Sequence, residues 1–416
     1  MSIIRVSHPS GIVNGKVRLD GSKSISNRAL IIRALSGENF KIEGLSTSDD
    51  TETLERLLND DGIVYDVHHA GTTFRFLTAY LALQEETQVL TGSERMLQRP
   101  IGPLVAALNS LGCNIKYLGE EGYPPLEISG PGDMAQLKEV SISAGISSQY
   151  ISALILIAPT LPNGLTINLE GAMVSESYLK MTLATVGEFG IVANYDGQKI
   201  EIAPQEYSIK DYVVEADWSA ASYHFAIAAL AKESNLVLEG LYANSTQGDA
   251  AITQISESIG VTTNWEENIA HLSNRSNANT FSYDFINQPD IAQTIAVICA
   301  ATGMKTDFSG LKTLRIKETD RIYALDTEFK KVGSSFELLH TDEDGKEHYG
   351  VGEKITATAV IPRFETYKDH RMAMAFGPLA LLFPIEINEP EVVTKSYPAF
   401  WEDLKKLGFQ IEEVSE

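Results

Sequence analysis

Residues 325–339, LDTEFKKVGSSFELL, carry the clearest structural pattern of the sequence. The apolar residues before Gly333 stand three and four apart, which is the spacing of an amphipathic helix. Gly333 suits the left-handed position that ends a helix, because glycine adopts that conformation without strain. The residues after it favour a β-strand. The stretch therefore predicts one joint in which a helix, a glycine and a strand follow each other.

The same joint recurs along the whole chain. It is found again at 53–67, 104–118, 181–195, 251–265 and 400–413, with its glycine at Gly62, Gly112, Gly190, Gly260 and Gly408. Successive glycines are 50, 78, 70, 73 and 75 residues apart. One such match is ordinary in an α/β protein, whereas six in register predict six repeated units. The first unit is about 25 residues shorter than the others on this spacing.

Each predicted unit also contains a second, more apolar helix. These helices are expected at 26–35, 71–83, 147–158, 217–230, 289–301 and 370–382. A helix that is apolar on all sides is a buried helix. The polar stretch 340–350 is typical of an exposed hairpin turn, with Asp344 and Gly345 at its tip.

The composition is that of a globular protein of two or three domains. The chain has 416 residues, of which 44% are hydrophobic and 21% charged. The net charge of −23 argues against nonspecific nucleic-acid binding and against docking on anionic membranes. No apolar run approaches the roughly 20 residues that span a bilayer, and the N-terminus has no signal-peptide pattern. Cys113 and Cys299 lie in apolar stretches without metal-type spacing, so we expect core residues of a soluble cytoplasmic protein.

Polar and cationic residues gather at the starts of the buried helices. Helix starts bind anions because their N–H groups are unpaired and the helix dipole is positive there. For any one cluster the alternative is helix capping, since Ser, Thr and Asp are preferred caps. Recurrence with cations beside the caps favours a shared site for a multiply anionic ligand. The residues concerned are Lys23, Ser24, Arg28, Gly71, Thr72, Thr73, Arg75, Ser147, Ser148, Gln149, Asp290, Asp369, His370 and Arg371.

Two further segments add charge. Arg95 and Arg99 stand four apart before a proline. Lys317 and Arg321 also stand four apart, which predicts that both lie on one helix face, with Glu318 offset by one position. A solvated helix start with salt bridges explains this second segment equally well.

The stretch 19–35, LDGSKSISNRALIIRAL, looks like half of a nucleotide-binding loop. A Walker A loop requires G-x-x-x-x-G-K-[ST], and here Ser22 separates Gly21 from Lys23, with no second glycine at the required spacing. The nucleotide reading is therefore rejected. An anion site remains, and a serine of this stretch is expected to cap the helix while its neighbours face the ligand.

At these same positions the chain resembles the enolpyruvyl transferase family of 5-enolpyruvylshikimate-3-phosphate synthases, also called 3-phosphoshikimate 1-carboxyvinyltransferases. The resemblance is spread over almost the whole chain and follows the family's order. It rests on LDGSKSISNRAL, AGTTFRFLTA, GSERMLQRPIGPLVAAL, ISSQYISAL, VSESYLKMTL, VEADWSAASYHFA, PDIAQTIAV, RIKETDRI, DHRMAMAF and TKSYPAFWEDL.

The resemblance implies an α/β fold of two lobes, each built from three βαβαββ units. Residues 1–20 with 217–416 would form one lobe and residues 21–216 the other. In the family the substrates bind between lobes that close.

The activity implied is transfer of the enolpyruvyl group of phosphoenolpyruvate to the 5-hydroxyl of shikimate 3-phosphate, with release of phosphate, in chorismate and aromatic amino acid biosynthesis. The resemblance implies no metal or organic cofactor. Its only implied partners are the two small-molecule substrates, with no nucleic acid and no membrane, and we expect a monomer.

The family's site residues carry over to matching positions. Asp290 resembles the base at the 5-hydroxyl, Glu318 the proton donor and acceptor at the methylene carbon, and Lys23 a further catalytic residue. The residues implied to bind shikimate 3-phosphate are Lys23, Ser24, Arg28, Ser147, Ser148, Gln149, Ser175, Tyr178, Asp290, Thr313 and Lys317. Those implied to bind phosphoenolpyruvate are Lys23, Gly71, Arg95, Gln149, Arg321, His370, Arg371 and Lys395.

Three positions depart from the family pattern: His69 replaces an asparagine, Phe74 a methionine, and Thr313 a shikimate-binding asparagine. A threonine cannot make both contacts of an amide at that reach, so altered affinity is expected. The nearest alternative function is that of a UDP-N-acetylglucosamine enolpyruvyltransferase, which typically uses a cysteine near the donor. Neither Cys113 nor Cys299 lies in a matching loop. The other alternative is a catalytically silent binding paralogue, against which the retained charged residues argue.

Overall fold

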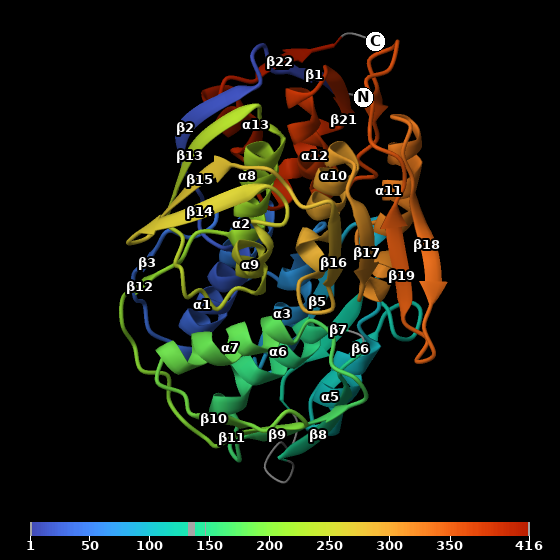
Figure 1. The fold of residues 1–416 in the computed structure, drawn as a ribbon. Coiled ribbons are helices and arrows are strands. Elements are labelled where there is room, and N and C mark those ends of the chain that lie inside the picture. The colour runs from blue at the N-terminus through green and yellow to red at the C-terminus, as the bar shows by residue number, and fades with distance from the viewer. Residues whose placement is uncertain (1, 132–137, 146, 415–416) are drawn as a thin grey trace. The chain divides into compact units, whose positions relative to one another are not determined.

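The computed structural model describes residues 2–131, 138–145 and 147–414 (Figure 1). It divides into unit 1, Met1–Asp20 with Glu215–Glu416, and unit 2, Gly21–Val214. The sequence placed the second crossing two residues later, after 216. Glu215 belongs to unit 1 because its carboxylate accepts hydrogen bonds there, from Trp218 Nε1, Tyr242 N, Ser245 Oγ and Gln247 Nε2.

The described residues form five four-stranded sheets and one two-stranded sheet. In unit 1 the sheets are, in spatial order, β14 (Val261–Glu266), β15 (Ile269–Asn274), β13 (Glu233–Glu239) and β2 (Ile12–Arg18); β16 (Thr280–Asp284), β17 (Lys305–Ser309), β19 (Glu347–Val351) and β18 (Phe336–Thr341); and β20 (Arg363–Phe364), β21 (Ile385–Asn388), β1 (Ile3–Ser7) and β22 (Gln410–Glu413). In unit 2 they are β4 (Val64–Asp66), β5 (Gln88–Thr91), β7 (Leu126–Ser129) and β6 (Asn114–Tyr117); β10 (Ala193–Tyr195), β11 (Lys199–Ile202), β9 (Leu165–Glu170) and β8 (Glu139–Ser143); and the pair β12 (Tyr212–Val213) and β3 (Ile42–Glu43).

The four-stranded sheets share one topology. In each, an edge strand pairs in parallel with the next strand, and two antiparallel strands complete the sheet, as a hairpin in all but one case. The parallel pair requires a crossover helix and the hairpin does not, which is the connectivity of a βαβαββ unit. The sheet of β20 and β21 is completed by β22 and by β1, the strands nearest the two chain ends. The α/β class with repeated units is therefore confirmed.

The two-stranded sheet explains the short first interval of the repeat. Its strands β12 and β3 are parallel, as are the first two strands of every other unit. Helix α1 (Lys23–Ser36) precedes β3, and helix α2 (Asp49–Leu58) follows it. Among the described residues this sheet has no hairpin, so the piece that the sequence lacks is the last two strands of the first unit.

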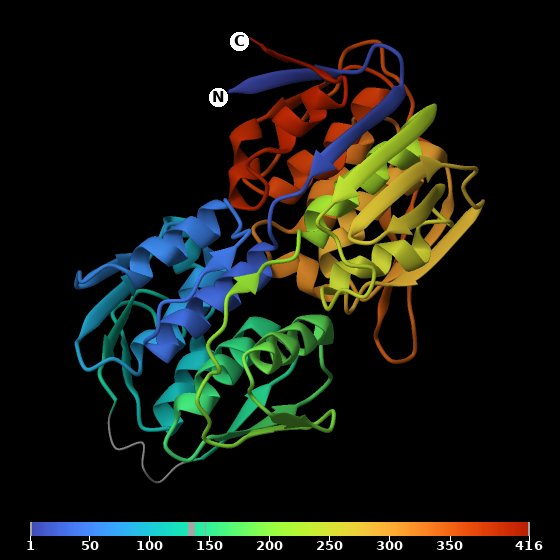
Figure 2. The ribbon, with the colours of Figure 1, turned by 90° about the vertical axis from the view of Figure 1, so that its left-hand side faces the viewer.

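The buried helices are α1, α3 (Gly71–Leu81) and α6 (Ser148–Ile157) in unit 2, and α8 (Trp218–Leu230), α10 (Ala292–Thr302) and α12 (His370–Phe376) in unit 1. Within each unit these three helices pack against one another. The second helices are α2, α5 (Gly102–Ser110), α7 (Glu176–Glu188), α9 (Ile252–Ile255), α11 (Arg321–Lys330) and α13 (Phe400–Lys406). Figure 2 shows β2, β13, β15 and β14 as one layer, with α8 against it.

Five of the six predicted helix-ending glycines have the expected left-handed backbone. Their φ angles are 94° at Gly112, 82° at Gly190, 87° at Gly260, 77° at Gly333 and 93° at Gly408. The prediction for Gly62 was wrong, because α2 ends earlier, at an Asn59 cap with φ of −106°. The polar turn at Asp60–Gly62 instead forms through Asp60 Oδ1, which accepts from Gly62 N at 2.9 Å.

Two further sequence predictions on the fold are confirmed. Cys113 and Cys299 are buried free thiols. The stretch 340–350 joins β18 to β19 in an antiparallel hairpin. No helix in the described part of the chain is long and apolar enough to cross a membrane.

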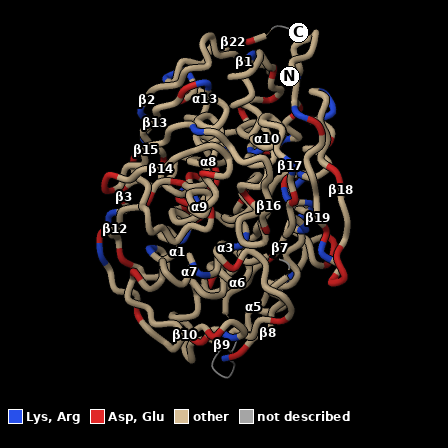
Figure 3. The backbone as a smooth tube through the Cα atoms, viewed as in Figure 1, with Lys and Arg blue, Asp and Glu red and all other residues tan. Residues whose placement is uncertain are grey.

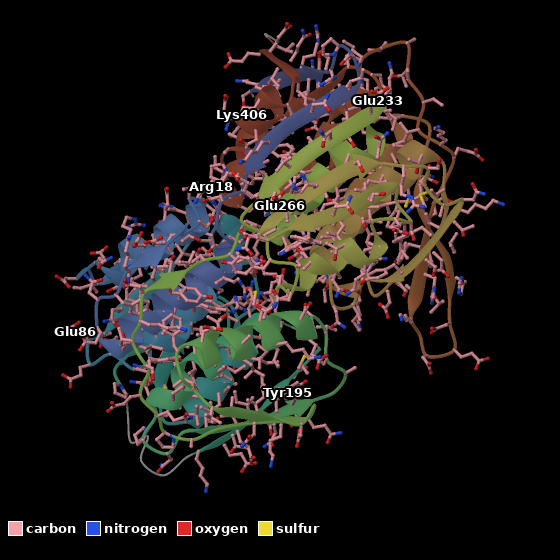
Figure 4. All side chains as sticks on the ribbon, turned by 60° about the vertical axis from the view of Figure 1, so that its left-hand side comes forward. Arg18, Glu86, Tyr195, Glu233, Glu266 and Lys406 are labelled. Atoms are coloured by element: carbon pink, nitrogen blue, oxygen red, sulfur yellow. The ribbon has the colours of Figure 1, made fainter. Side chains whose placement is uncertain are left out.

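The acidic residues are spread along the chain in both units. Figure 3 shows Asp and Glu in many separate segments rather than in one. Glu233 and Glu266, labelled in Figure 4, lie at ends of β13 and β14, and both are exposed. The strongly negative net charge is thus compatible with cationic clusters at the helix starts.

Candidate functional site

In unit 2 the starts of the buried helices are joined through polar side chains. Gln149 Nε2, in the first turn of α6, donates to Thr72 Oγ1, in the first turn of α3, at 3.2 Å. Ser147 caps α6, since its Oγ accepts from Gln149 N at 3.3 Å. Ser148 beside it is buried. The structure therefore brings together helix starts that are 77 residues apart in the sequence.

Arg28 connects α1 to α6 and α7 from inside unit 2. Its side chain is 1% exposed, and its Nε donates to Thr182 Oγ1 at 2.8 Å while its Nη2 donates to Ser152 Oγ at 3.1 Å. Its Nη1 donates to Ser24 O at 2.7 Å, and its Nη2 reaches Tyr178 O at 3.4 Å. Burial lowers the pKa of Arg28 to about 10. These oxygens are all neutral, so Arg28 is a buried cation whose contacts within unit 2 do not cancel its charge.

Two further predicted residues of this unit lie at the start of α7. Ser175 precedes the helix with φ of 54°, a left-handed conformation that a residue with a side chain rarely adopts. Such strain persists only where the surroundings impose it, and it gathers at binding sites. Tyr178 lies one turn further on, with its carbonyl bonded by Arg28.

Gly71 opens α3 beside two arginines. A Cβ at this position would lie 2.5 Å from Arg99 Nη1 and 3.0 Å from Arg75 Nη1, so a larger residue would displace the two guanidinium groups. Arg75 also donates to Gly71 O at 2.6 Å. The arginine predicted here, Arg95, is exposed on the short helix α4 (Glu94–Leu97) and donates to Gln98 Oε1 at 3.3 Å.

The sequence placed Arg75 in the helix-start clusters and showed Arg99 as a cation near Arg95, but it assigned neither residue a ligand contact. The signal was present, since both stand within a few residues of Gly71 or Arg95. The position of the Arg99 loop depends on a contact that the sequence does not reveal, in which the Tyr150 hydroxyl donates to Pro100 O.

The start of α1 carries Lys23 and Ser24, both half-buried. The expectation that a serine caps this helix was wrong. Ser22 occupies the cap position with φ of −58° and ψ of 118°, and its side chain accepts no hydrogen bond from the helix. Its hydroxyl is buried. The prediction assumed that preferred cap residues cap, whereas the side-chain rotamer is set by packing.

A second polar network holds α1, α2 and α3 together. The buried Asp50 Oδ1 accepts from Asn27 Nδ2 at 2.9 Å and from Thr73 Oγ1 at 2.8 Å. Thr51 Oγ1 donates to Asn27 Oδ1 at 2.8 Å. These residues fix the helix starts that carry Lys23 and Gly71. The sequence shows this network only as two acidic residues, Asp49 and Asp50, at the start of α2. Acidic residues are common at helix starts, so the pair did not indicate a network.

In unit 1 the buried Arg321 is bound by three carboxylates. Its Nε donates to Asp369 Oδ2 at 2.7 Å, its Nη1 to Asp290 Oδ1 at 3.2 Å and its Nη2 to Glu318 Oε2 at 2.9 Å. Burial alone would lower the pKa of Arg321, but Asp369 and Glu318 outweigh it and hold that pKa above its ordinary value. The two predicted catalytic carboxylates thus share one guanidinium.

Asp290 lies among three cations. Besides Arg321, Arg371 Nη2 lies 3.1 Å from its Oδ2 and Lys317 Nζ lies 4.0 Å from its Oδ1. The prediction that Lys317 and Arg321 share a helix face was wrong. Lys317 is extended, with φ of −82° and ψ of −152°, and α11 begins only at Arg321. The two cations nevertheless meet, because both face the Asp290 carboxylate.

Arg371 is held at the start of α12. Asp369 caps this helix by accepting from Arg371 N at 2.9 Å. The guanidinium donates to Asp290 O at 3.1 Å, and it lies 3.5 Å from the Tyr223 hydroxyl and 3.4 Å from Ser219 Oγ. Three helix starts of unit 1 therefore meet at Arg371. Ser219 and Tyr223 were not predicted, since nothing in the sequence indicates which side chains face an arginine.

The remaining predicted residues of unit 1 lie nearby in the chain or on its neighbours. His370 is buried, with its Nδ1 3.9 Å from Asp369 Oδ1. Lys395 ends a short helix and donates to Lys368 O at 2.7 Å. Lys368 and Tyr367 both have left-handed backbones, with φ of 56° and 55°. Thr313 lies half-buried in the turn Lys312–Ile316.

The described residues contain no group of three His, Cys, Asp or Glu side chains that could hold a metal ion. Each unit instead presents a set of cations, hydroxyls and amide groups at helix starts. Such a set can bind phosphate and carboxylate groups, and in unit 1 it holds carboxylates able to transfer protons.

Comparison with known proteins identifies related chains. The family model described as EPSP synthase (3-phosphoshikimate 1-carboxyvinyltransferase) matches residues 8–60 and 54–404. A 3-phosphoshikimate 1-carboxyvinyltransferase of Bacteroides fragilis (strain YCH46) is 45% identical over 410 residues, covering 98% of each chain. One from Sulfurovum sp. (strain NBC37-1) is 35% identical over 432 residues, covering 96% of this chain and 98% of the relative.

The fold also has a solved counterpart. The structure of EPSP synthase from Acinetobacter baumannii superposes with a TM-score of 0.77 and covers 100% of both chains at 21% sequence identity. At that identity the likeness bears on the fold alone.

Replacing Arg321 by glutamine should destabilise the protein by about 3–5 kcal/mol, because it leaves buried carboxylates without their shared guanidinium. Arg315→Gln is the matched control, since Arg315 lies on the same segment but is 42% exposed in its ion pairs. The control should cost about 1 kcal/mol or less. Denaturant unfolding of the three proteins measures both values, and equal losses would contradict a central role for Arg321.

Proposed function

The chain belongs to the EPSP synthase (3-phosphoshikimate 1-carboxyvinyltransferase) family, and from this premise we propose that it transfers the enolpyruvyl group of phosphoenolpyruvate to the 5-hydroxyl of shikimate 3-phosphate. Phosphate is the other product. The observation in the structure that supports this best is the Asp290 carboxylate, held among Arg321, Arg371 and Lys317. A base surrounded by cations suits a reaction between two polyanions.

The reaction needs three proton transfers and the loss of one phosphate. The methylene carbon of phosphoenolpyruvate takes a proton, which leaves its neighbouring carbon electron-poor. The 5-hydroxyl oxygen attacks that carbon and loses its own proton. The carbon–oxygen bond to phosphate then breaks, and a proton leaves the methyl group to restore the double bond. One acid that later acts as a base, and one base at the hydroxyl, are sufficient.

We assign these proton transfers to the carboxylates of unit 1. Glu318 gives a proton to the methylene carbon and later removes one from the methyl group. Asp290 accepts the proton of the 5-hydroxyl. Arg321 and Arg371 contact the two oxygens of Asp290 and hold the carboxylate in place. Asp290 and Glu318 both contact Arg321, and this shared contact fixes the orientation of the two carboxylates. Groups that are oriented before the reaction begins lower its barrier.

Substrate binding is assigned to both units. In unit 2, Lys23, Ser24 and Arg28 with the serines at the starts of α6 and α7 bind shikimate 3-phosphate, helped by Gln149 and Tyr178. Gly71 with Arg95 binds phosphoenolpyruvate, and Lys23 and Gln149 also contact this substrate.

In unit 1, Thr313 and Lys317 contact shikimate 3-phosphate. Unit 1 also binds phosphoenolpyruvate, through Arg321, His370, Arg371 and Lys395. We add Arg99 to the donor set because it shares the space above Gly71 with Arg75.

The three residues that depart from the family pattern have different surroundings. Phe74 is buried in the core of unit 2, so it fills space rather than contacts a ligand. His69 Nε2 lies 3.2 Å from Asp49 Oδ2 at the entrance of α3. Thr313 keeps a hydroxyl where the family has an amide, and we expect it to retain one of two contacts.

We also propose that units 1 and 2 correspond to the two lobes of the family, and that the chain works as a cytoplasmic monomer without a cofactor. The net charge of −23 supports a protein that does not bind nucleic acid or anionic membranes. Two buried thiols and no disulfide among the described residues suit a reducing compartment.

The decisive experiment measures phosphate released from phosphoenolpyruvate by the purified chain. Release is expected with shikimate 3-phosphate as acceptor and not with UDP-N-acetylglucosamine. The opposite pattern would reassign the chain to the nucleotide-sugar enzyme. Binding of both substrates without release from either mixture would identify a silent binding paralogue.

Asp290→Asn should lower kcat by about 100-fold to 10,000-fold while substrate affinity changes far less, because the amide keeps the shape but accepts no proton. Fluorescence or calorimetric titration gives the affinity, and the phosphate assay gives kcat. Turnover close to that of the unaltered protein would remove Asp290 from the role of base.

Gly71→Ala should raise the KM for phosphoenolpyruvate by about tenfold or more, because the new Cβ displaces the Arg99 and Arg75 side chains. Gly187→Ala serves as the matched control, since Gly187 lies in α7 with no atom within 4 Å of the added carbon. That control should leave both KM values unchanged. An equal effect of the two substitutions would contradict the assignment of Gly71.

A further inference from the structure

Asp249 is a buried carboxylate to which the proposed reaction gives no role. It lies in the turn Gly248–Ala251 (η2), is 5% exposed, and accepts a hydrogen bond from Ser219 Oγ. In the part of the chain that the structure describes, no Lys or Arg forms an ion pair with it. A buried carboxylate without a cation is costly, so its place in unit 1 needs a physical reason.

Helix capping does not supply that reason. The start of α8, which carries Ser219, is already capped by Asp217, whose side chain accepts from Ala220 N at 2.9 Å. The turn that contains Asp249 follows Gln247 and has no side-chain cap. Neither helix end therefore requires the Asp249 carboxylate.

Ser219 links Asp249 to Arg371. A serine hydroxyl carries one proton, and here that proton is donated to Asp249 Oδ2. The Ser219 oxygen is then left to accept from Arg371 Nη2, at 3.4 Å. The hydrogen bonds run in one direction, from Arg371 through Ser219 to Asp249. They join α12, α8 and η2.

Arg371 consequently lies between two buried carboxylates. Asp290 Oδ2 contacts its Nη2 directly at 3.1 Å, and Asp249 acts on the same nitrogen through Ser219. Both carboxylates compete with an anionic ligand for this guanidinium. The proposed reaction uses Asp290 as its base and gives Asp249 no role, so a change in the charge of Asp249 leaves the proposed base in place.

We propose that Asp249 is a positioning residue that holds the Arg371 guanidinium through Ser219, and that ionisation of Asp249 weakens the binding of phosphoenolpyruvate. The inference rests on the proposed function, which assigns Arg371 to that substrate. It adds a pH-dependent control of phosphoenolpyruvate affinity by a residue that does not itself contact the substrate.

The surroundings of Asp249 set the pH range of this effect. Burial raises the pKa of Asp249 to about 7, Asp290 and Asp217 act in the same direction, and Arg371 and the Ser219 hydrogen bond oppose them. Tyr283 of β16 also feels the Asp249 charge, which contributes to its own raised pKa. These charged and titratable groups come from the short turn Pro289–Ile291 (η3), from α8 and its cap, from α12 and from β16.

The sign of the effect follows from linkage. An anion bound at Arg371 adds negative charge near Asp249 and raises the Asp249 pKa further, so the liganded protein holds a proton that the free protein has lost. Binding therefore takes up a proton at and above about pH 7, and affinity falls as pH rises through that range, by at most about tenfold per pH unit. Below about pH 6 both states are protonated and the effect disappears.

The test compares the unaltered protein with Asp249→Asn between about pH 6 and pH 9, at saturating shikimate 3-phosphate. Asparagine accepts from Ser219 as aspartate does but carries no charge. Near pH 8.5 the variant should have a KM for phosphoenolpyruvate about three- to tenfold below that of the unaltered protein, with similar values near pH 6. Its kcat should change by less than about twofold, because Asp249 touches no reacting atom.

Two other variants separate charge from structure. Ser219→Ala keeps the Asp249 charge but breaks the link, so it should raise this KM about twofold to tenfold at every pH and keep the pH slope. Glu386→Gln neutralises a buried carboxylate that pairs with Arg5 and Arg363 instead, and it should leave KM and slope unchanged. A slope in Asp249→Asn equal to that of the unaltered protein would overturn the inference, as would a fall in kcat alone.

A second measurement needs no folded variant. Calorimetric titration of the unaltered protein with phosphoenolpyruvate near pH 8, in buffers of different ionisation enthalpy, counts protons taken up on binding. The donor is fully ionised at that pH, so uptake comes from the protein. No uptake would refute the role of Asp249. Absence of phosphate release by the unaltered protein would instead refute the proposed function, and this inference with it.

Discussion

Arg321 is the residue on which the charged part of unit 1 depends. One guanidinium, 1% exposed, binds carboxylates that come from the turn before α10, the segment before α11 and the cap of α12. Burying the guanidinium or the carboxylates alone would cost much free energy. Together they cost less, because the planar guanidinium donates hydrogen bonds to several carboxylate oxygens at once. The arrangement that orients Asp290 and Glu318 is therefore also the one that makes their burial possible. Function and stability are not separable at this point.

The buried cation of unit 2, Arg28, has a different kind of partner. Arg28 contacts hydroxyl and carbonyl oxygens rather than carboxylates, and burial lowers its pKa to about 10. Neutral oxygens accept its hydrogen bonds but leave its positive charge in place, so the charge can attract an anionic ligand nearby. Strained backbone accompanies both sets: Ser175 in unit 2 and the pair Tyr367 and Lys368 in unit 1 have left-handed conformations next to predicted ligand contacts. Conformations of this cost persist where packing imposes them, which is consistent with sites shaped for a ligand.

The sequence predicted the features that depend on local chemistry. Left-handed glycines such as Gly333 reveal helix ends, and their spacing reveals the repeated unit. Predictions failed where a local rule was overridden by packing. Ser22 does not cap α1, and Lys317 is extended rather than helical, so the cation pair with Arg321 forms for a reason other than helical spacing. Residues such as Asp249 stayed invisible because their significance comes from partners distant in the sequence.

The shortened first unit shows which parts of a βαβαββ unit the site requires. The unit retains α1, with Lys23 and Ser24 at its start, although its sheet has only the parallel pair β3 and β12 among the described residues. The start of α1 does not depend on the absent hairpin. Ile25 packs against Met181 and Val214, and Arg28 is bonded to α6 and α7. Because the helix is held by other helices, the edge of the sheet can be lost while the residues proposed to bind substrate keep their support.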